Sequence, residues 1–296
     1  MVTGNRHLAG IAFGLLAYAM WGFFPLFFRQ LAHVSPIDVL SNRAVWACVF
    51  VGVLLSLRRQ WHKVAAVFRS ARQVLLLLIA SLLIGSNWLV FLWAVANQQV
   101  VASSLGYFLT PLVNVLLGLL VLKERLNRLE WLSVALALAA MANEIVAIGH
   151  LPWVSLVLAG TFGTYGLVRK QLPVDAVSGL WLETLAMLPV CALYAWWQAA
   201  SGHAVFTGHD PATTALLVGS GALTALPLLA FAAATQRLDL ASVGMLMYIN
   251  PTLQFVTAIW VFGEPMRRAQ LLSFGLIWLG LLVFSYSAWG KYRRPA

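Results

Sequence analysis

The sequence predicts an all-α integral membrane protein with ten transmembrane helices, arranged as two five-helix repeats of opposite orientation. Three observations lead to this fold class. Of the 296 residues, 61% are apolar and 9% are charged, whereas soluble domains contain about 25% charged residues. Apolar runs recur along the whole chain at lengths that would cross a bilayer. A stretch of the first half also reappears in the second half.

Ten apolar runs are bounded by charged or turn-forming residues. A helix needs about 20 apolar residues to cross the hydrocarbon core, and each run is close to that length. The runs lack the two-residue alternation of a membrane β-barrel, so we expect helices. The expected spans are 8–28, 38–57, 74–95, 101–122, 129–148, 152–168, 177–199, 212–234, 240–262 and 269–288.

Basic residues are distributed unevenly between the two sides of these spans. If the N-terminus is cytoplasmic, fifteen of the 19 Lys and Arg residues lie in cytoplasmic segments, three lie outside and Arg43 lies within a span. The positive-inside rule therefore predicts that both termini are cytoplasmic. Topology and attraction to anionic lipid then explain the formal net charge of +10, and we expect no nucleic-acid partner.

Two segments of the chain match when one is shifted by 140 residues, which superposes Pro111 on Pro251. Small residues precede both prolines. We therefore divide the chain into a first repeat, residues 1–149, and a second repeat, residues 150–296. Because each repeat has an odd number of spans, the second repeat enters the membrane from the opposite face. Such inverted repeats predict a substrate site near the bilayer midplane, between the two halves.

Several classes of enzyme lack their essential residues. None of the lysines is followed by Ser or Thr, so the chain has no Walker A phosphate loop. All 6 His and every Asp lie in loops or at span ends. This placement argues against a buried Ser–His dyad, a zinc-protease helix and an intramembrane aspartyl dyad. We expect a protein that is not an enzyme and that uses no cofactor or metal.

Two ionisable residues lie within the expected spans, where a charge costs about 2.5–3.5 kcal/mol on insertion scales. Arg43 lies near the outer end of the second span, and Glu183 lies nearer the cytoplasmic end of the seventh. From the helical rise, each residue is roughly 8–10 Å deep, from opposite sides of a core of roughly 30 Å. We therefore expect them to mark the two ends of one polar path rather than to form a salt bridge.

More than one role stays open for each of these two residues. Glu183 is the candidate for proton coupling, because burial favours the neutral carboxyl, but a structural hydrogen-bonding role and direct contact with substrate are alternatives. Arg43 either holds backbone carbonyls or Asp38 in place, or it binds an anionic substrate or acts in gating.

Three further glutamates are assigned structural roles. Glu124 and Glu264 end two helices beside basic residues, so we expect ion-paired helix ends. Glu144 approaches the outer end of the fifth span, and we expect it at the boundary with water.

The longest cytoplasmic loop, residues 58–73, has Trp61, Val64 and Phe68 at helical spacing among basic residues. This pattern predicts a short helix that lies in the membrane interface.

Neutral polar and aromatic residues within the spans complete the candidate substrate path. Such groups often bond only a neighbouring helix, but tryptophans beside polar residues can also stack against a solute. A proline inside a span frees a backbone carbonyl and marks a break or gate in the helix. The candidate path residues are Trp21, Asn87, Trp88, Tyr107, Asn114, Thr161, Tyr165, Trp181, Tyr248, Asn250 and Gln254, and the helix-break positions are Pro25, Pro111 and Pro251.

Five segments of the chain form a recognisable set: Leu16–Pro25, Asn42–Trp46, Gly85–Trp88, Ser104–Asn114 and Met247–Pro251. Together they resemble the RarD branch of the EamA transporters, within the drug/metabolite transporter superfamily. The resemblance covers nearly the whole chain. RarD sequences often have His-Arg where this chain has Asn42-Arg43, so the match extends to the arginine and not to a titrating residue before it.

The resemblance implies ten spans as two inverted EamA repeats in a bacterial inner membrane. It implies a permease that moves small metabolites or drugs outward, and RarD proteins are often labelled chloramphenicol-sensitive or chloramphenicol-resistance permeases. We therefore expect a secondary transporter of chloramphenicol-like or amino-acid-like solutes that works by alternating access and exchanges protons through Glu183. The alternatives are an uncoupled facilitator and a non-transporting membrane scaffold or sensor. The expected partners are a small solute, protons and the lipid bilayer, and the sequence specifies no oligomeric state.

Overall fold

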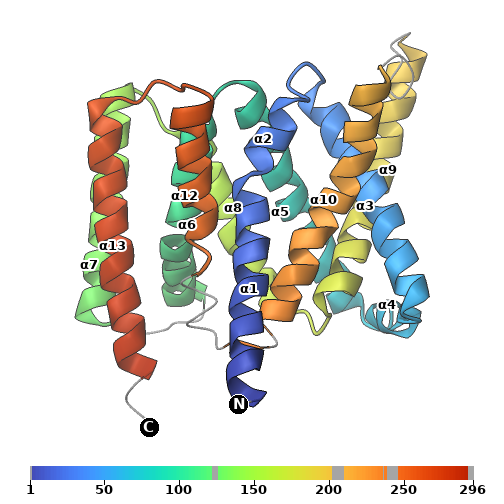
Figure 1. Ribbon diagram of the computed structural model, residues 1–296, viewed down its shortest axis with the longest axis horizontal. Helices are drawn as coiled ribbons and strands as arrows, with labels where there is room; N and C mark the ends of the chain where they lie inside the picture. The colour runs from blue at the N-terminus through green and yellow to red at the C-terminus, as the bar shows by residue number, and fades with distance from the viewer. Residues whose placement is uncertain (1, 122–125, 202–209, 236, 239–245, 293–296) are drawn as a thin grey trace.

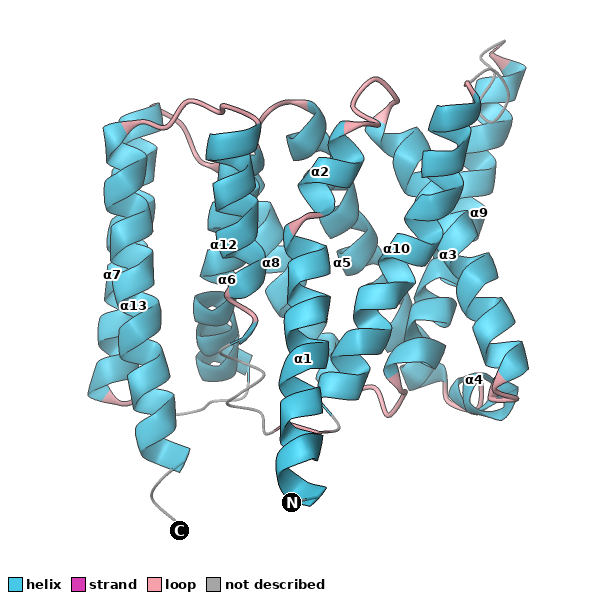
Figure 2. Ribbon diagram, viewed as in Figure 1, coloured by secondary structure: helices cyan, strands magenta, loops and turns pink. Residues whose placement is uncertain are grey.

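The computed structural model describes residues 2–121, 126–201, 210–235, 237–238 and 246–292. Within these residues the chain folds into helices and contains no strand, as Figure 2 shows. Eight of the helices are long and apolar enough to cross a membrane. The all-α membrane class predicted from the sequence is therefore confirmed, although two of the ten expected spans are not among these eight.

The two expected spans that are not among these eight correspond to α8 and to the segment around α12. The span expected at 152–168 is α8 (Trp153–Lys170), an 18-residue helix whose last turn carries Arg169 and Lys170. The span expected at 240–262 begins in residues 239–245, which lie outside the described part of the chain. It continues as α12 (Ile249–Val256) and a π-helical turn, Thr257–Val261.

The other long helices agree closely with the expected spans, and two short helices, α2 and α4, lie between them. In the first half these are α1 (Val2–Gly22), α2 (Phe24–Arg29), α3 (Pro36–Leu57), α4 (Trp61–Val67), α5 (Ala71–Ala96), α6 (Val100–Val121) and α7 (Arg128–Ile148). In the second half they are α9 (Ala176–Ala200), α10 (Pro211–Thr235) and α13 (Arg268–Tyr292). The short α4 confirms that a helix forms in the loop of residues 58–73.

Figure 1 shows how these helices are arranged. The helices α7 and α13 pack together at one end of the molecule, and α3, α9 and α10 lie at the other end. Between them stand α1, α5, α6, α8 and α12. The start of α1 and the end of α13 lie on the same face of the molecule.

The pair α7 and α13 is antiparallel and is joined by polar side chains. Near the start of α7, Asn127 Nδ2 donates to Ser287 Oγ at 2.7 Å. Near its end, Asn143 Nδ2 donates to Ser273 Oγ at 2.8 Å. Residue numbers rise along one helix as they fall along the other, so the two helices run in opposite directions.

The helix α6 and the segment around α12 are also antiparallel. Ser103 Oγ donates to Gln254 Oε1 at 3.1 Å, and the backbone N–H of Val100 donates to Glu264 Oε1 at 2.8 Å. The helices that carry the two matched prolines, α6 and α12, therefore lie side by side and run in opposite directions.

Glu264 caps the N-terminus of α6. Its second oxygen accepts from the backbone N–H of Val101 at 2.9 Å. The first N–H groups of a helix have no partner within the helix and carry a partial positive charge, so a carboxylate stabilises them. Burial raises the pKa of Glu264, against the opposing effect of these two bonds and of the Arg29 charge. The ion-paired helix end expected here is thus mainly a helix cap, and Glu124 lies outside the described residues.

Glu144 is not at a boundary with water, contrary to the expectation from the sequence. Only 2% of the residue is exposed. Its carboxylate accepts from Ser273 Oγ at 2.8 Å and from Gln270 Nε2 at 3.4 Å, both on α13. The contact with α13 covers the carboxylate, and its depth along a single helix could not reveal that partner.

Candidate functional site

A cavity of about 1720 Å³ lies between the helices, and side chains from both halves of the chain line it. Small-molecule sites typically have volumes of about 300–1,000 Å³, so the cavity has room for an organic solute together with water. Lining residues come from α1, α2, α3, α5, α6, α7, α8, α9, α10, α12 and α13.

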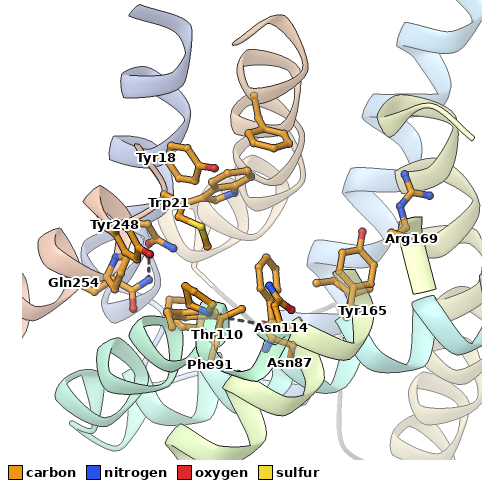
Figure 3. A pocket seen from close by; sticks show the side chains of 18 of the residues that line it. Tyr18, Trp21, Asn87, Phe91, Thr110, Asn114, Tyr165, Arg169, Tyr248 and Gln254 are labelled. Atoms are coloured by element: carbon orange, nitrogen blue, oxygen red, sulfur yellow. Dashed lines mark hydrogen bonds between the residues drawn. The ribbon is translucent and has the colours of Figure 1, made fainter. Parts of the chain in front are cut away.

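Each helix presents one stripe of side chains to the cavity. On α5 the stripe is Ile84, Asn87, Trp88 and Phe91, and on α6 it is Tyr107, Thr110, Pro111, Asn114 and Val115. Within each stripe the positions follow the i, i+3, i+4, i+7 pattern of one helix face. The stripes combine neutral polar groups with aromatic rings, several of which are drawn in Figure 3.

Asn87 is the centre of a hydrogen-bond network in the cavity wall. Its Nδ2 donates to the carbonyl of Leu158 at 3.0 Å and to Thr161 Oγ1 at 2.9 Å. Its Oδ1 accepts from the Tyr107 hydroxyl at 3.1 Å. The network joins α5, α6 and α8 and fixes the position of the Tyr107 ring.

Aromatic and amide groups from α1, α10 and α12 form another part of the wall. Tyr18 and Trp21 lie with their ring centroids 5.5 Å apart, and Phe231 is 5.8 Å from Trp21. In Figure 3, Tyr18 and Trp21 lie near Tyr248 and Gln254, away from Tyr165 and Arg169. Gln254 Nε2 donates to Asn250 Oδ1 at 2.8 Å.

The Glu183 carboxylate has two polar neighbours at the wall of the cavity. Its Oε1 lies 3.5 Å from Arg169 Nη1, and its Oε2 accepts from the Tyr165 hydroxyl at 3.1 Å. The Glu183 side chain is 1% exposed and that of Arg169 is 17% exposed, so the pair joins a buried acid to a partly accessible base. Figure 3 shows Tyr165 and Arg169 side by side.

Arg43 is enclosed by aromatic rings. Its guanidinium carbon is 4.1 Å from the centroid of a Trp88 ring, 5.1 Å from that of Phe28 and 5.5 Å from that of Phe24. Its Nε donates to Thr224 Oγ1 at 2.7 Å. Its Nη1 has no hydrogen-bond partner among the described residues.

Most of the residues proposed from the sequence are brought together here. Twelve of them line the cavity: Trp21, Arg43, Asn87, Trp88, Tyr107, Pro111, Asn114, Tyr165, Glu183, Tyr248, Asn250 and Pro251. Gln254 lines it as well. Thr161 lies outside the lining and accepts a hydrogen bond from Asn87.

Two proposed residues lie elsewhere. Trp181 stacks edge-on against Trp61, with ring centroids 4.9 Å apart. It is two residues before Glu183, a rotation of about 200° around the helix, so the two side chains point to opposite sides. Pro25 lies in the first turn of α2, after a break at Phe23, and it is buried outside the cavity lining. Its missing N–H is tolerated in the first turn of a helix.

Sequence analysis did not assign several lining residues to the site. Tyr18 is three residues before Trp21, and Phe91 is four after Asn87, so helical spacing would have found both. Arg169 was assigned only to a cytoplasmic segment, and Thr224 was not singled out. The partners of these two lie on other helices, and the spacing within one helix does not reveal them.

A polar and aromatic cavity between apolar membrane helices is the architecture of a membrane transport protein. The EamA-like transporter family matches residues 8–142. An uncharacterized transporter of Vibrio cholerae is 43% identical over 93% of this chain and 91% of its own length. Protein RarD of Escherichia coli is 38% identical over 97% of each chain. A relative named chloramphenicol-sensitive protein RarD, from Pseudomonas aeruginosa, is 31% identical over 97% of each chain.

A solved crystal structure also shares the fold. It has a TM-score of 0.59 and 19% identity, and the match covers 94% of this chain and 96% of the other. The chain belongs to the EamA-like transporter family, in its RarD branch.

Proposed function

We propose that this protein is a secondary transporter that moves a small organic solute through the central cavity by alternating access. The observation that carries the proposal is the cavity itself, because its polar and aromatic lining is built from both halves of an otherwise apolar chain. A membrane scaffold would have no use for Arg43 and Glu183 at the wall of such a cavity, where charged groups are costly.

The two halves, residues 1–149 and 150–296, act as inverted five-helix repeats in this proposal. The packing supports it, because contacts recur when each helix is exchanged for its counterpart in the other half. The helix α1 packs against α10 and α12, and its counterpart α8 packs against α5 and α6. The antiparallel pairs α6–α12 and α7–α13 each join one counterpart to the other.

Both termini are cytoplasmic and the membrane is a bacterial inner membrane in this proposal. The excess of Lys and Arg on one side of the expected spans supports the orientation. A cysteine at position 3 or 295, labelled in intact cells and in inverted vesicles, tests it. Labelling only in inverted vesicles is the expected result, and labelling in intact cells would contradict it.

Transport is tested by counterflow with the purified protein in liposomes. The solute panel contains chloramphenicol, amino acids and aromatic carboxylates, and each solute is loaded inside while its labelled form is added outside. We expect accumulation of at least one labelled solute above protein-free liposomes. A protein that keeps its fold and moves no member of the panel would favour the scaffold.

Proton coupling through Glu183 is the finer proposal, and an uncoupled facilitator is its alternative. The Arg169 ion pair at 3.5 Å favours the facilitator, because it stabilises an ionised Glu183 without a proton. The burial of the carboxylate favours coupling. Uptake that requires a pH gradient and that Glu183→Gln abolishes would establish coupling. Uptake that is equal with and without a gradient would establish the facilitator.

A further inference from the structure

We infer that Arg43 is the docking point for the anionic group of the transported solute, and that this solute is an organic anion with an apolar or aromatic body. The inference rests on the proposed transport function and adds the chemical class of the solute. It arises from a difference between the charged residues of one cavity: Glu183 has a basic partner and Glu130 caps a helix, whereas Arg43 has no acidic partner in the described part of the chain and its Nη1 makes no hydrogen bond there.

The lining contains three basic and two acidic side chains among the described residues, namely Arg43, Arg169, Lys170, Glu130 and Glu183. Glu183 Oε2 accepts from Tyr165, and its Oε1 forms an ion pair with Arg169 that is too long and poorly aligned to be a hydrogen bond. Glu130 accepts from the backbone N–H of Asn127 in the capping box of α7. The two acids are therefore already engaged, and the cavity favours an anion over a cation.

Arg43 lacks an acidic partner in the described part of the chain. Two ion pairs occur there, Lys63–Asp175 and Arg169–Glu183, and neither involves it. The residue is 3% exposed, yet it lines the cavity and its Nη1 has no hydrogen-bond partner among the described residues. A buried donor without a partner is costly, so an incoming acceptor gains more here than it would at the surface.

The surroundings of Arg43 select the geometry of that acceptor. The single bond to Thr224 and the rings of Trp88, Phe24 and Phe28 hold the guanidinium plane in place. A planar guanidinium binds a carboxylate with two parallel hydrogen bonds, which a lysine ammonium cannot reproduce. A carboxylate is thus the group that fits best.

The rest of the cavity suits an apolar or aromatic body attached to that carboxylate. Beside Arg43, the α5 stripe presents Trp88 and Phe91, and α6 presents Tyr107. The Tyr107 ring lies 6.3 Å from Phe91 and 6.0 Å from Phe162, in a tilted and an edge-on arrangement respectively. Such rings attract an aromatic body by burial and by edge-to-face contact.

The alternative role for Arg43 is purely structural, with cation–π contacts and the Thr224 bond as its complete function. In that role, the attraction between the guanidinium and the three rings would hold the side chain in place without a ligand. The two roles differ in one measurable property, which is discrimination between an acid and its neutral analogue.

The experiment uses two probes that share one body, 3-phenylpropionate and 3-phenylpropanamide. Binding to the purified full-length protein at pH 7.5 is measured as the rise in melting temperature with probe concentration. Counterflow of each labelled probe is measured in liposomes. For the wild type we expect affinity for the acid to exceed that for the amide by about tenfold, which corresponds to about 1.4 kcal/mol.

Arg43→Gln is expected to reduce this ratio to about twofold while affinity for the amide stays unchanged. Arg43→Lys keeps the charge without the planar fork and should give an intermediate ratio, which provides a test if the glutamine variant does not fold. Arg237→Gln is the matched control. Arg237 also lies over a ring, 5.3 Å from the Phe13 centroid, but it does not line the cavity. Its substitution should leave the ratio unchanged.

Equal affinity of the wild type for acid and amide would overturn the inference, and so would the absence of binding by both. A parallel loss of both probes in folded Arg43→Gln would assign Arg43 a structural role and overturn it too. Counterflow of the amide without any acid preference would refute the anion site and leave transport standing. Selective binding of the acid without counterflow of either probe would support the site and refute the transport function.

Discussion

Two regions of this molecule bury polar side chains among apolar helices, and they do so in different ways. Between α7 and α13, Asn143 and Glu144 bond directly to Ser273 of the partner helix. At the cavity, Arg43 retains a donor with no partner among the described residues. Polar groups in membrane helices therefore divide into those that join helices and those that remain available for a solute.

The two buried glutamates make the same distinction. Glu144 faces α13 and does not line the cavity. Glu183 lies at the cavity wall beside a partly accessible arginine. Substitutions near Glu144 should therefore change stability without changing transport, and substitutions of Glu183 should change transport more than stability.

The largest expected effect on stability is that of Ser273→Ala. The change removes the donor to the buried Glu144 at 2.8 Å and one of the two acceptors of the half-buried Asn143, which keeps its bond to the Ala269 carbonyl. We expect a loss of about 2 kcal/mol, because Glu144 Oε2 is left buried without its donor and such a group costs about 1–3 kcal/mol. Thermal unfolding in detergent measures the loss. Counterflow per folded molecule should equal that of the wild type, and a selective loss of counterflow would break the comparison.

Glu183→Gln should have a smaller effect on stability and a larger effect on function. The amide oxygen can still accept from Tyr165, but the buried Nη1 of Arg169 loses its charged neighbour, although 17% of the Arg169 side chain is exposed. We expect a loss of about 1.5 kcal/mol. If transport is proton-coupled, counterflow persists in this variant while uptake driven by a pH gradient disappears. A destabilisation larger than that of Ser273→Ala would show that the ion pair is mainly structural.

The smallest effect should occur at a helix end outside the cavity. Asp175 caps α9: its Oδ1 accepts from the N–H groups of Val177 and Ser178. Burial alone would raise the pKa of Asp175, but the hydrogen bonds from Ser178 and Val177 and the charge of Lys63 outweigh it, so its pKa is lowered. Asp175→Ala should cost about 1 kcal/mol at neutral pH.

The lowered pKa fixes the direction of the pH dependence. The stability contributed by ionised Asp175 is present above its ordinary pKa of about 3.9 and is lost as the pH falls through the folded value. The difference in melting temperature between wild type and Asp175→Ala should therefore shrink below about pH 4. Asp175→Asn keeps the cap and should lie closer to the wild type at neutral pH. A difference that grows on acidification would contradict the assignment.

The sequence predicted much of the fold and a large part of the site. Length and hydropathy define the spans because a helix in lipid must satisfy its own backbone and carry an apolar surface. Asn87, Tyr107 and Glu183 could be singled out because a polar group within a span is costly.

The parts that the sequence did not predict depend on contacts between helices. The pairing of Glu183 with Arg169 requires α8 and α9 to lie side by side at the end of α8. The burial of Glu144 requires α13 against α7. Trp181 was included because it is a tryptophan beside polar residues in the sequence, although its two-residue offset from Glu183 already places it on the far side of the helix. Rotation of each helix about its axis was therefore the main information that was missing.

A single pair of variants on α10 tests most directly whether a solute passes through the cavity. Leu228 lines the cavity, whereas Leu226 does not and is 44% exposed on the same helix. Leu228→Trp should reduce counterflow of labelled 3-phenylpropionate at least tenfold without lowering the melting temperature, and Leu226→Trp should leave it at the wild-type rate. Equal counterflow through both folded variants would contradict a path through this cavity.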